Sequence, residues 1–73
     1  RTEMQIFGDR VKKELKEQGR KQSELAAYLN VRQSTLSEWL NDHNEPPMSA
    51  IPKIAAYLGV TADYLLGMSD EWK

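Results

Sequence analysis

Apolar residues recur in this chain at three- and four-residue spacing, and this periodicity limits its possible folds more than any other feature. The first such stripe consists of Met4, Phe7, Val11 and Leu15. Spacing of this kind places side chains on one face of an α-helix, whereas a half-buried strand needs strict alternation. Since no stretch of the chain has a strand pattern, the sequence predicts an all-α protein.

Residues that favour turns divide the chain into five expected helices. A glycine or an asparagine, which tolerates a positive φ, follows four of the periodic stretches, at Gly19, Asn30, Gly59 and Gly67. Ser49 and Thr61 stand where side-chain N-caps would begin the last two helices. The expected helices span residues 3–18, 22–29, 33–41, 50–58 and 62–66.

The size and composition of the chain fit one small domain with one core. It has 73 residues and no cysteine, so neither a disulfide nor a thiolate metal site can stabilise it. Its apolar runs are too short to cross a membrane, and residues 1–20 are too charged for a signal peptide. We therefore expect a compact five-helix bundle over residues 1–67, located in the cytoplasm. Residues 68–73 are expected to form a tail or the start of a linker. Trp72 suggests either that this tail docks on the body of the domain or on a partner, or that it is a disordered end.

The charges are unevenly distributed, although the net charge is only −1. Residues 10–32 carry a net charge of +4, and residues 33–73 carry −4. A basic N-terminal half can face phosphate groups while the acidic half faces away from them. The same charges also suit an ordinary solvated surface, so charge alone leaves a nucleic-acid partner open.

Residues 22–41 have the pattern of a helix-turn-helix, in which two short helices are joined by a tight turn. The small Ala26 stands where the two helices would cross, and Asn30 takes the turn position. The apolar residues that would seat both helices on the rest of the domain are Leu25, Leu29, Val31, Leu36 and Trp39.

The third expected helix has two different faces. At about 100° per residue, Leu36, Trp39 and Leu40 fall on one side of it. The other side carries Gln33, Ser34, Ser37, Glu38 and Asn41. Apart from Glu38, these residues are short or bear amides, and their hydroxyl and amide groups can hydrogen-bond to base edges. Arg32, at the entrance to this helix, can reach a guanine or a phosphate. An ordinary surface helix is the alternative interpretation.

Several segments match a known pattern in order and at matching spacing. They are Gln22-Ser-Glu-Leu-Ala26, Asn30-Val31, Ser34-Thr-Leu-Ser-Glu-Trp39, the region of Pro46, Ile54-Ala55 and Leu58-Gly-Val-Thr-Ala-Asp-Tyr-Leu-Leu-Gly67. Through them the chain resembles the lambdoid phage repressor and Cro-like (XRE-type) helix-turn-helix family over residues 7–67, nearly its whole length.

This resemblance implies a lambda-repressor-like DNA-binding domain. Members of the family are transcriptional repressors that act as homodimers on near-palindromic operators, with the third helix in the major groove. A domain this small dimerises weakly in such systems, so we expect that a C-terminal oligomerisation domain is missing from the chain.

The resemblance also assigns roles to individual residues. Base reading is implied for Gln33, Ser34, Ser37 and Glu38, to which Arg32 is added from its position. Phosphate contacts are implied for Lys21, Gln22, Asn41, His43 and Asn44, and Gln22 is also expected to brace Gln33. Dimer contacts are implied for Val60, Tyr64, Leu65, Leu66 and Gly67.

Five positions depart from the family pattern: Leu15, Arg20, Lys21, Arg32 and Leu40. The family commonly has a buried ion pair between an arginine late in the first helix and a glutamate at the end of the third, where this chain has Leu15 and Leu40. We expect an apolar contact between these two leucines to replace the pair. Lys21 replaces a usual hydroxyl residue, so the second helix is expected to lack a side-chain cap.

Other functions have little support in the sequence. His43 is the only histidine, and with no cysteine a zinc site there would need carboxylate ligands. No glycine-rich phosphate loop is present, and a triad of Ser49, His43 and Asp42 would have to converge from neighbouring loop residues. We therefore expect no enzyme activity and no cofactor. The main alternative is a protein-interaction module on the same fold, of antitoxin or antirepressor type, which the acidic second half of the chain favours.

Overall fold

The computed structural model describes residues 3–71, and side chains from residue 6 onward. This range contains five helices and no strand: α1 (Glu3–Glu17), α2 (Gln22–Leu29), α3 (Gln33–Leu40), α4 (Ala50–Leu58) and α5 (Ala62–Leu65). The all-α prediction is confirmed, and the expected bounds differ from these by one residue at the ends of α1, α3 and α5. The side chains of Met4 and Trp72 lie outside the described residues. Within that part of the chain, none of the helices has the length and apolar character needed to span a bilayer.

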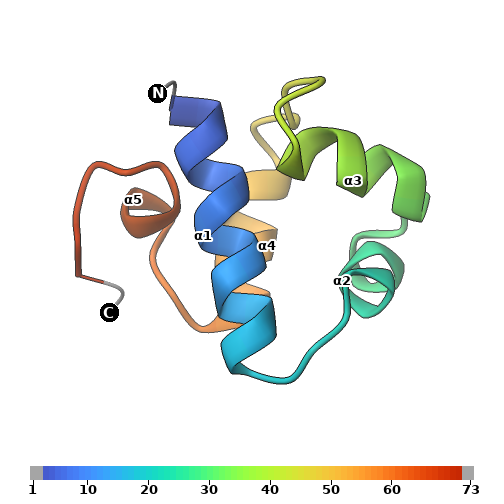
Figure 1. The fold of residues 1–73 in the computed structure, drawn as a ribbon, viewed down its shortest axis with the longest axis horizontal. Helices are drawn as coiled ribbons and strands as arrows, with labels where there is room; N and C mark the ends of the chain where they lie inside the picture. Colours follow the sequence, from blue (N-terminus) through green and yellow to red (C-terminus); the bar gives the residue numbers. More distant parts are fainter. Residues whose placement is uncertain (1–2, 72–73) are drawn as a thin grey trace.

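The five helices are arranged around α1, which runs through the middle of the molecule (Figure 1). Helix α1 packs against α3 and α5, and α4 packs against α2 and α5. Helices α2 and α3 lie on one side of α1, and α5 with the C-terminal segment lies on the other (Figure 1). Helix α3 is therefore at an edge of the molecule, away from the C-terminal segment.

The turn between α2 and α3 is formed as the sequence predicts. Asn30 adopts the left-handed conformation, with φ 58° and ψ 43°. This allows the N–H of Val31 to donate to the Ala26 carbonyl at 3.0 Å, which closes the end of α2. The chain then enters α3 after only two further residues.

The predicted N-caps have different outcomes. The Thr61 hydroxyl accepts from the Tyr64 N–H at 3.1 Å and caps α5, as expected. Ser49 is the N-cap residue of α4, as predicted, but its backbone is already helical (φ −67°, ψ −22°) and its side chain makes no cap hydrogen bond. The carbonyls of Pro47 and Met48 accept the N–H groups of the first residues of α4 instead, so no side-chain cap is needed there.

Helix α2 has no side-chain cap from Lys21, as its sequence predicts. Glu24 provides part of the missing stabilisation, because its Oε1 accepts from the Lys21 N–H at 2.9 Å. A carboxylate in the first turn also interacts favourably with the helix dipole.

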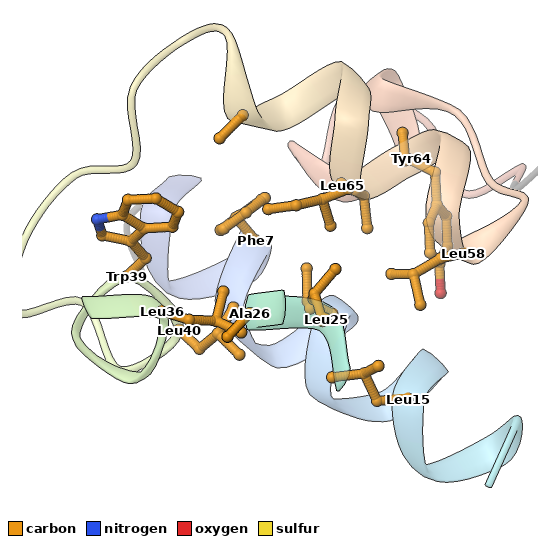
Figure 2. Packing of buried hydrophobic residues seen from close by; sticks show 14 residues of the cluster. Phe7, Leu15, Leu25, Ala26, Leu36, Trp39, Leu40, Leu58, Tyr64 and Leu65 are labelled. Carbon is orange, nitrogen blue, oxygen red and sulfur yellow. The ribbon is translucent and has the colours of Figure 1, made fainter. Parts of the chain in front are cut away.

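Buried side chains from all five helices meet in one cluster (Figure 2). Leu36, Trp39 and Leu40 attach α3 to this cluster and are only 0%, 7% and 2% exposed. Leu15 is also buried, at 3% exposed. Figure 2 draws Leu40 close to Leu36 and draws Leu15 well away from both, so the expected contact between Leu15 and Leu40 is not seen there.

Helices α1 and α3 approach each other closely at Gly8. This residue is buried, and a Cβ atom placed on it would overlap the carbonyl oxygen of Leu40. Glycine is unfavourable inside a helix by about 0.5–1 kcal/mol relative to alanine. Here its missing side chain allows the C-terminal end of α3 to rest on the backbone of α1.

The segment after α5 folds back onto α1. Arg10 holds it: the guanidinium donates to the carbonyls of Tyr64 and Ser69 at 2.6 and 2.7 Å, and it pairs with Asp70 at 3.0 Å. The guanidinium also lies over the Tyr64 ring, 4.4 Å from its centroid. The Thr61 hydroxyl donates to the carbonyl of Glu71 at 3.4 Å. Residues 68–71 are therefore attached to the body of the domain.

Candidate nucleic-acid interface

The exposed face of α3 carries the polar residues that the sequence singles out. Gln33, Ser34 and Glu38 are exposed, and Ser37 is half-buried beside them. The opposite face of the helix is buried in the core, so α3 cannot turn this polar surface inward without breaking the apolar cluster. These four residues therefore share the solvent-facing side of α3, a helix that lies at an edge of the molecule (Figure 1).

The N-terminal ends of α2 and α3 are the sites of the predicted cations. Arg32 is exposed at the N-cap position of α3, and its extended backbone (φ −71°, ψ 147°) leads directly into Gln33. Lys21 is exposed at the N-cap position of α2, and Gln22 follows it half-buried. Helix N-termini carry N–H groups that favour anions, so both cations stand where an anion would already be favoured.

The loop after α3 folds back over the end of that helix. The Glu38 carbonyl accepts from the N–H groups of His43 and Asn44, at 2.9 and 3.3 Å. The Asn44 side-chain amide donates to the Glu38 carboxylate at 3.2 Å. His43 and Asn44, both exposed, are thereby held next to the polar face of α3.

A hydrogen-bonded chain links α1 to the same face. Lys12 Nζ donates to Asn41 Oδ1 at 2.6 Å. Asn41 Nδ2 donates to the backbone carbonyl of Ser37 at 2.9 Å and to its Oγ at 3.2 Å. The amide nitrogen of Asn41 thus donates to two acceptors of Ser37. Sequence reasoning missed Lys12, because 29 residues separate it from Asn41 and only the packing of α1 on α3 brings the two together.

Comparison with known proteins gives the family. A family model described as helix-turn-helix matches residues 11–65, which include α2, the turn at Asn30 and α3. This chain belongs to that helix-turn-helix family. It is also similar to the HTH-type transcriptional regulator ImmR of Bacillus subtilis (strain 168), with 32% identity over 64 residues. The aligned part covers 88% of this chain and 50% of that protein, so the chain spans about half the length of this curated relative. No solved structure matches.

The residues that the sequence assigns to dimer contacts lie away from α3 in this helix-turn-helix domain, and they divide into two groups. Tyr64 and Leu65 are 6% and 0% exposed and belong to the core of their own chain. Val60 and Leu66 are only partly buried, and Gly67 is exposed. Any surface contact here would therefore be made by the side chains of Val60 and Leu66 rather than by those of Tyr64 and Leu65.

A shallow polar groove lies on the α5 side of the helix-turn-helix domain. Its volume is about 440 Å³, and its lining includes Lys13, Glu17, Val60 and Asp70. Tyr64 closes part of it, with its hydroxyl 3.3 Å from Glu14 Oε2. Among the described residues, no group of three or more histidine, cysteine or acidic side chains is placed to hold a metal ion.

Proposed function

We propose that this helix-turn-helix domain binds double-stranded DNA in a sequence-specific way and represses transcription, with α3 in the major groove. The observation that carries this proposal is the orientation of α3. Its apolar side is buried through Leu36 and Leu40, whereas Gln33 and Ser34 are free to meet bases. The similarity to a protein named as a transcriptional regulator agrees with it.

Base reading is proposed for the exposed residues at the start and middle of α3. The Gln33 amide can pair with the N6 and N7 atoms of adenine through two hydrogen bonds. The Glu38 carboxylate can accept from the amino group of cytosine, which would offset its repulsion by phosphates. Arg32 can reach guanine or a phosphate, and Ser34 and Ser37 complete the reading surface.

Phosphate contacts are proposed for residues on both sides of α3. Lys21 and Gln22 would hold the backbone on one side, and His43 and Asn44 on the other. Asn41 shares this second position, and its amide nitrogen already donates to two acceptors of Ser37. Lys12 adds a cation close to it. Such contacts set the orientation of the protein on the duplex rather than its sequence preference.

A homodimer on a near-palindromic operator is proposed for the DNA-bound state. Two copies of α3 would then occupy half-sites about one helical turn, roughly 34 Å, apart. Val60, Leu66 and Gly67 form the surface proposed for contact between the copies, and the backbone of Tyr64 and Leu65 supports it. This surface is on the side of α1 opposite α3, so dimer contacts there would leave the reading face uncovered.

Selection of bound sequences from a random pool of DNA duplexes tests this function. We expect one sequence to be enriched, with two halves related by two-fold symmetry. Lys13→Ala serves as a control, because Lys13 is exposed and lines the groove on the α5 side. Its selected sequence is expected to equal that of the unchanged chain. Absence of any DNA binding at low salt would contradict the proposal and favour a protein partner.

A further inference from the structure

We propose that Lys12 and Asn41 set the hydrogen-bond polarity of Ser37, so that Ser37 reads an acceptor atom on the edge of a base. This inference rests on the proposed function and deepens it, because it names what α3 recognises at one position. It is carried by the three hydrogen bonds that run from α1, through the end of α3, to the reading face.

Lys12 fixes the orientation of the Asn41 side-chain amide. An ammonium group can only donate hydrogen bonds, so the atom that lies 2.6 Å from Lys12 Nζ must be the amide oxygen. The nitrogen of the amide then faces Ser37. The 2.9 Å contact with the Ser37 backbone carbonyl requires the same orientation, because a carbonyl can only accept. Two partners on different helices therefore agree on which end of the amide meets Ser37.

Asn41 in turn determines where the hydroxyl hydrogen of Ser37 points. Asn41 Nδ2 donates to Ser37 Oγ at 3.2 Å and occupies one of its lone pairs. The hydroxyl hydrogen cannot lie along the same line, since two hydrogens would then face each other. It must point away from Asn41, where it is available to a ligand that approaches the exposed face of α3.

The atom that meets this hydrogen has to be an acceptor. In the major groove, N7 and O6 of guanine, N7 of adenine and O4 of thymine are acceptors, whereas the amino groups of cytosine and adenine are donors. Cytosine therefore presents no acceptor, and Ser37 is expected to favour guanine or thymine over cytosine at the base it meets, while adenine presents both kinds of group. The neighbouring Glu38 carboxylate can only accept, so these two adjacent residues select base atoms of opposite polarity.

The substitution Asn41→Asp tests the inference, because it keeps the shape of the side chain and removes its hydrogens. The new carboxylate still accepts from Lys12. Its second oxygen replaces the amide nitrogen, so it is repelled by the Ser37 backbone carbonyl and accepts from the Ser37 hydroxyl instead. Ser37 then presents only lone pairs to the DNA and should prefer the amino group of cytosine or adenine. The base that Ser37 meets is identified as the position whose preference is lost in Ser37→Ala. At that position we expect the ratio of guanine and thymine to cytosine to shift by about two- to tenfold, the value of one hydrogen bond.

A second set of variants tests the role of Lys12 separately. Lys12→Met removes one of the two partners that orient the amide, and we expect it to weaken the preference at the Ser37 position by less than Asn41→Asp does, because the Ser37 carbonyl still accepts from the amide nitrogen. Lys12→Arg supplies a donor again and should restore that preference. Lys13→Met removes the neighbouring charge on α1, which pairs with Glu17 at 3.8 Å, and should leave the Ser37 position unchanged.

Two results would overturn the inference while the proposed function stands. One is an Asn41→Asp chain that keeps the original preference at the Ser37 position. The other is a Ser37→Ala chain that loses preference at no position, although Gln33→Ala does. An unchanged chain that enriches no sequence at all contradicts the proposed function itself, so the two kinds of failure are distinguishable. Circular dichroism at the assay temperature shows that each variant is folded.

Discussion

Gln33, the first residue of α3, is expected to contribute to the choice of sequence rather than to binding in general. It is exposed, and its amide is suited to adenine. We expect Gln33→Ala to lower affinity for the selected operator by about 1–3 kcal/mol and to relax preference at one base position. Competition between the operator and single-base variants measures this. An unchanged preference at every position would show that α3 is not the reading helix.

Lys21 is expected to behave in the opposite way, because it is exposed at the N-terminal end of α2 and is assigned to a phosphate. Lys21→Ala should weaken binding to all DNA sequences by the same factor. It should also reduce the magnitude of the slope of log affinity against log salt by about 1, since one fewer counterion is released. Fluorescence anisotropy with the selected operator and with unrelated duplexes shows whether the loss of affinity is general or confined to the operator. A loss confined to the operator would contradict the phosphate assignment.

Single residues differ in how far their sequence context predicts them. Asn30 was predicted to be left-handed, and Thr61 to cap α5, because each conformation depends on neighbours within four residues. Ser49 stands at the predicted N-cap position of α4 but makes no side-chain cap, since the carbonyls of Pro47 and Met48, positioned by the preceding loop, accept the first N–H groups of the helix. The bonds of Lys12 lie beyond local reasoning, because they exist only once α1 and α3 are packed together.

At the scale of whole helices, the contact between α1 and α3 depends on Gly8. A side chain there would overlap the Leu40 carbonyl, so α3 would have to move outward. We expect Gly8→Ala to lower the free energy of unfolding by about 1–3 kcal/mol, the usual effect of overpacking. In an exposed helix the same substitution would instead raise it, by up to about 1 kcal/mol. Denaturation by urea measures the free energy of unfolding of both chains and so shows whether Gly8→Ala lowers or raises it.

A control for this substitution is available in α4. Ala56 is exposed there, and Ala56→Gly changes helix propensity without touching a packed surface. This substitution should lower the free energy of unfolding by about 0.5–1 kcal/mol. If Gly8→Ala proves more stable than the original chain, the two helices do not need to approach as closely as the structure shows.

The helices themselves were largely predictable, and their packing partners were not. The bounds of α2 and α4 follow from apolar spacing and from turn residues, which are local signals. The pairing of α1 with α3 is set by the shapes of side chains that are far apart in the sequence. Gly8 was a usable signal for this close approach, because a glycine inside a helical pattern often stands where another element packs closely against the helix.

For the whole molecule, the uneven charge distribution predicts how binding depends on salt. Lys21, Arg32 and Lys12 lie near α3, whereas residues 33–73 are acidic overall. If about five phosphates are contacted, log affinity should fall against log salt with a slope near −4 to −5. Titration with mixed genomic DNA at several salt concentrations measures this slope. A slope near zero would show that phosphates contribute little.

The segment that Arg10 holds against α1 has a practical consequence for such assays. Because residues 68–71 run along the α5 side of the molecule, a fluorescent reporter joined shortly after Glu71 would begin about as far from α3 as this small protein allows. The described start of α1, at Glu3, lies nearer to α3, as Figure 1 shows. A small reporter attached after Glu71 therefore keeps clear of α3, whereas a bulky fused partner there would stand beside Leu66 and Gly67, the surface proposed for contact between two copies.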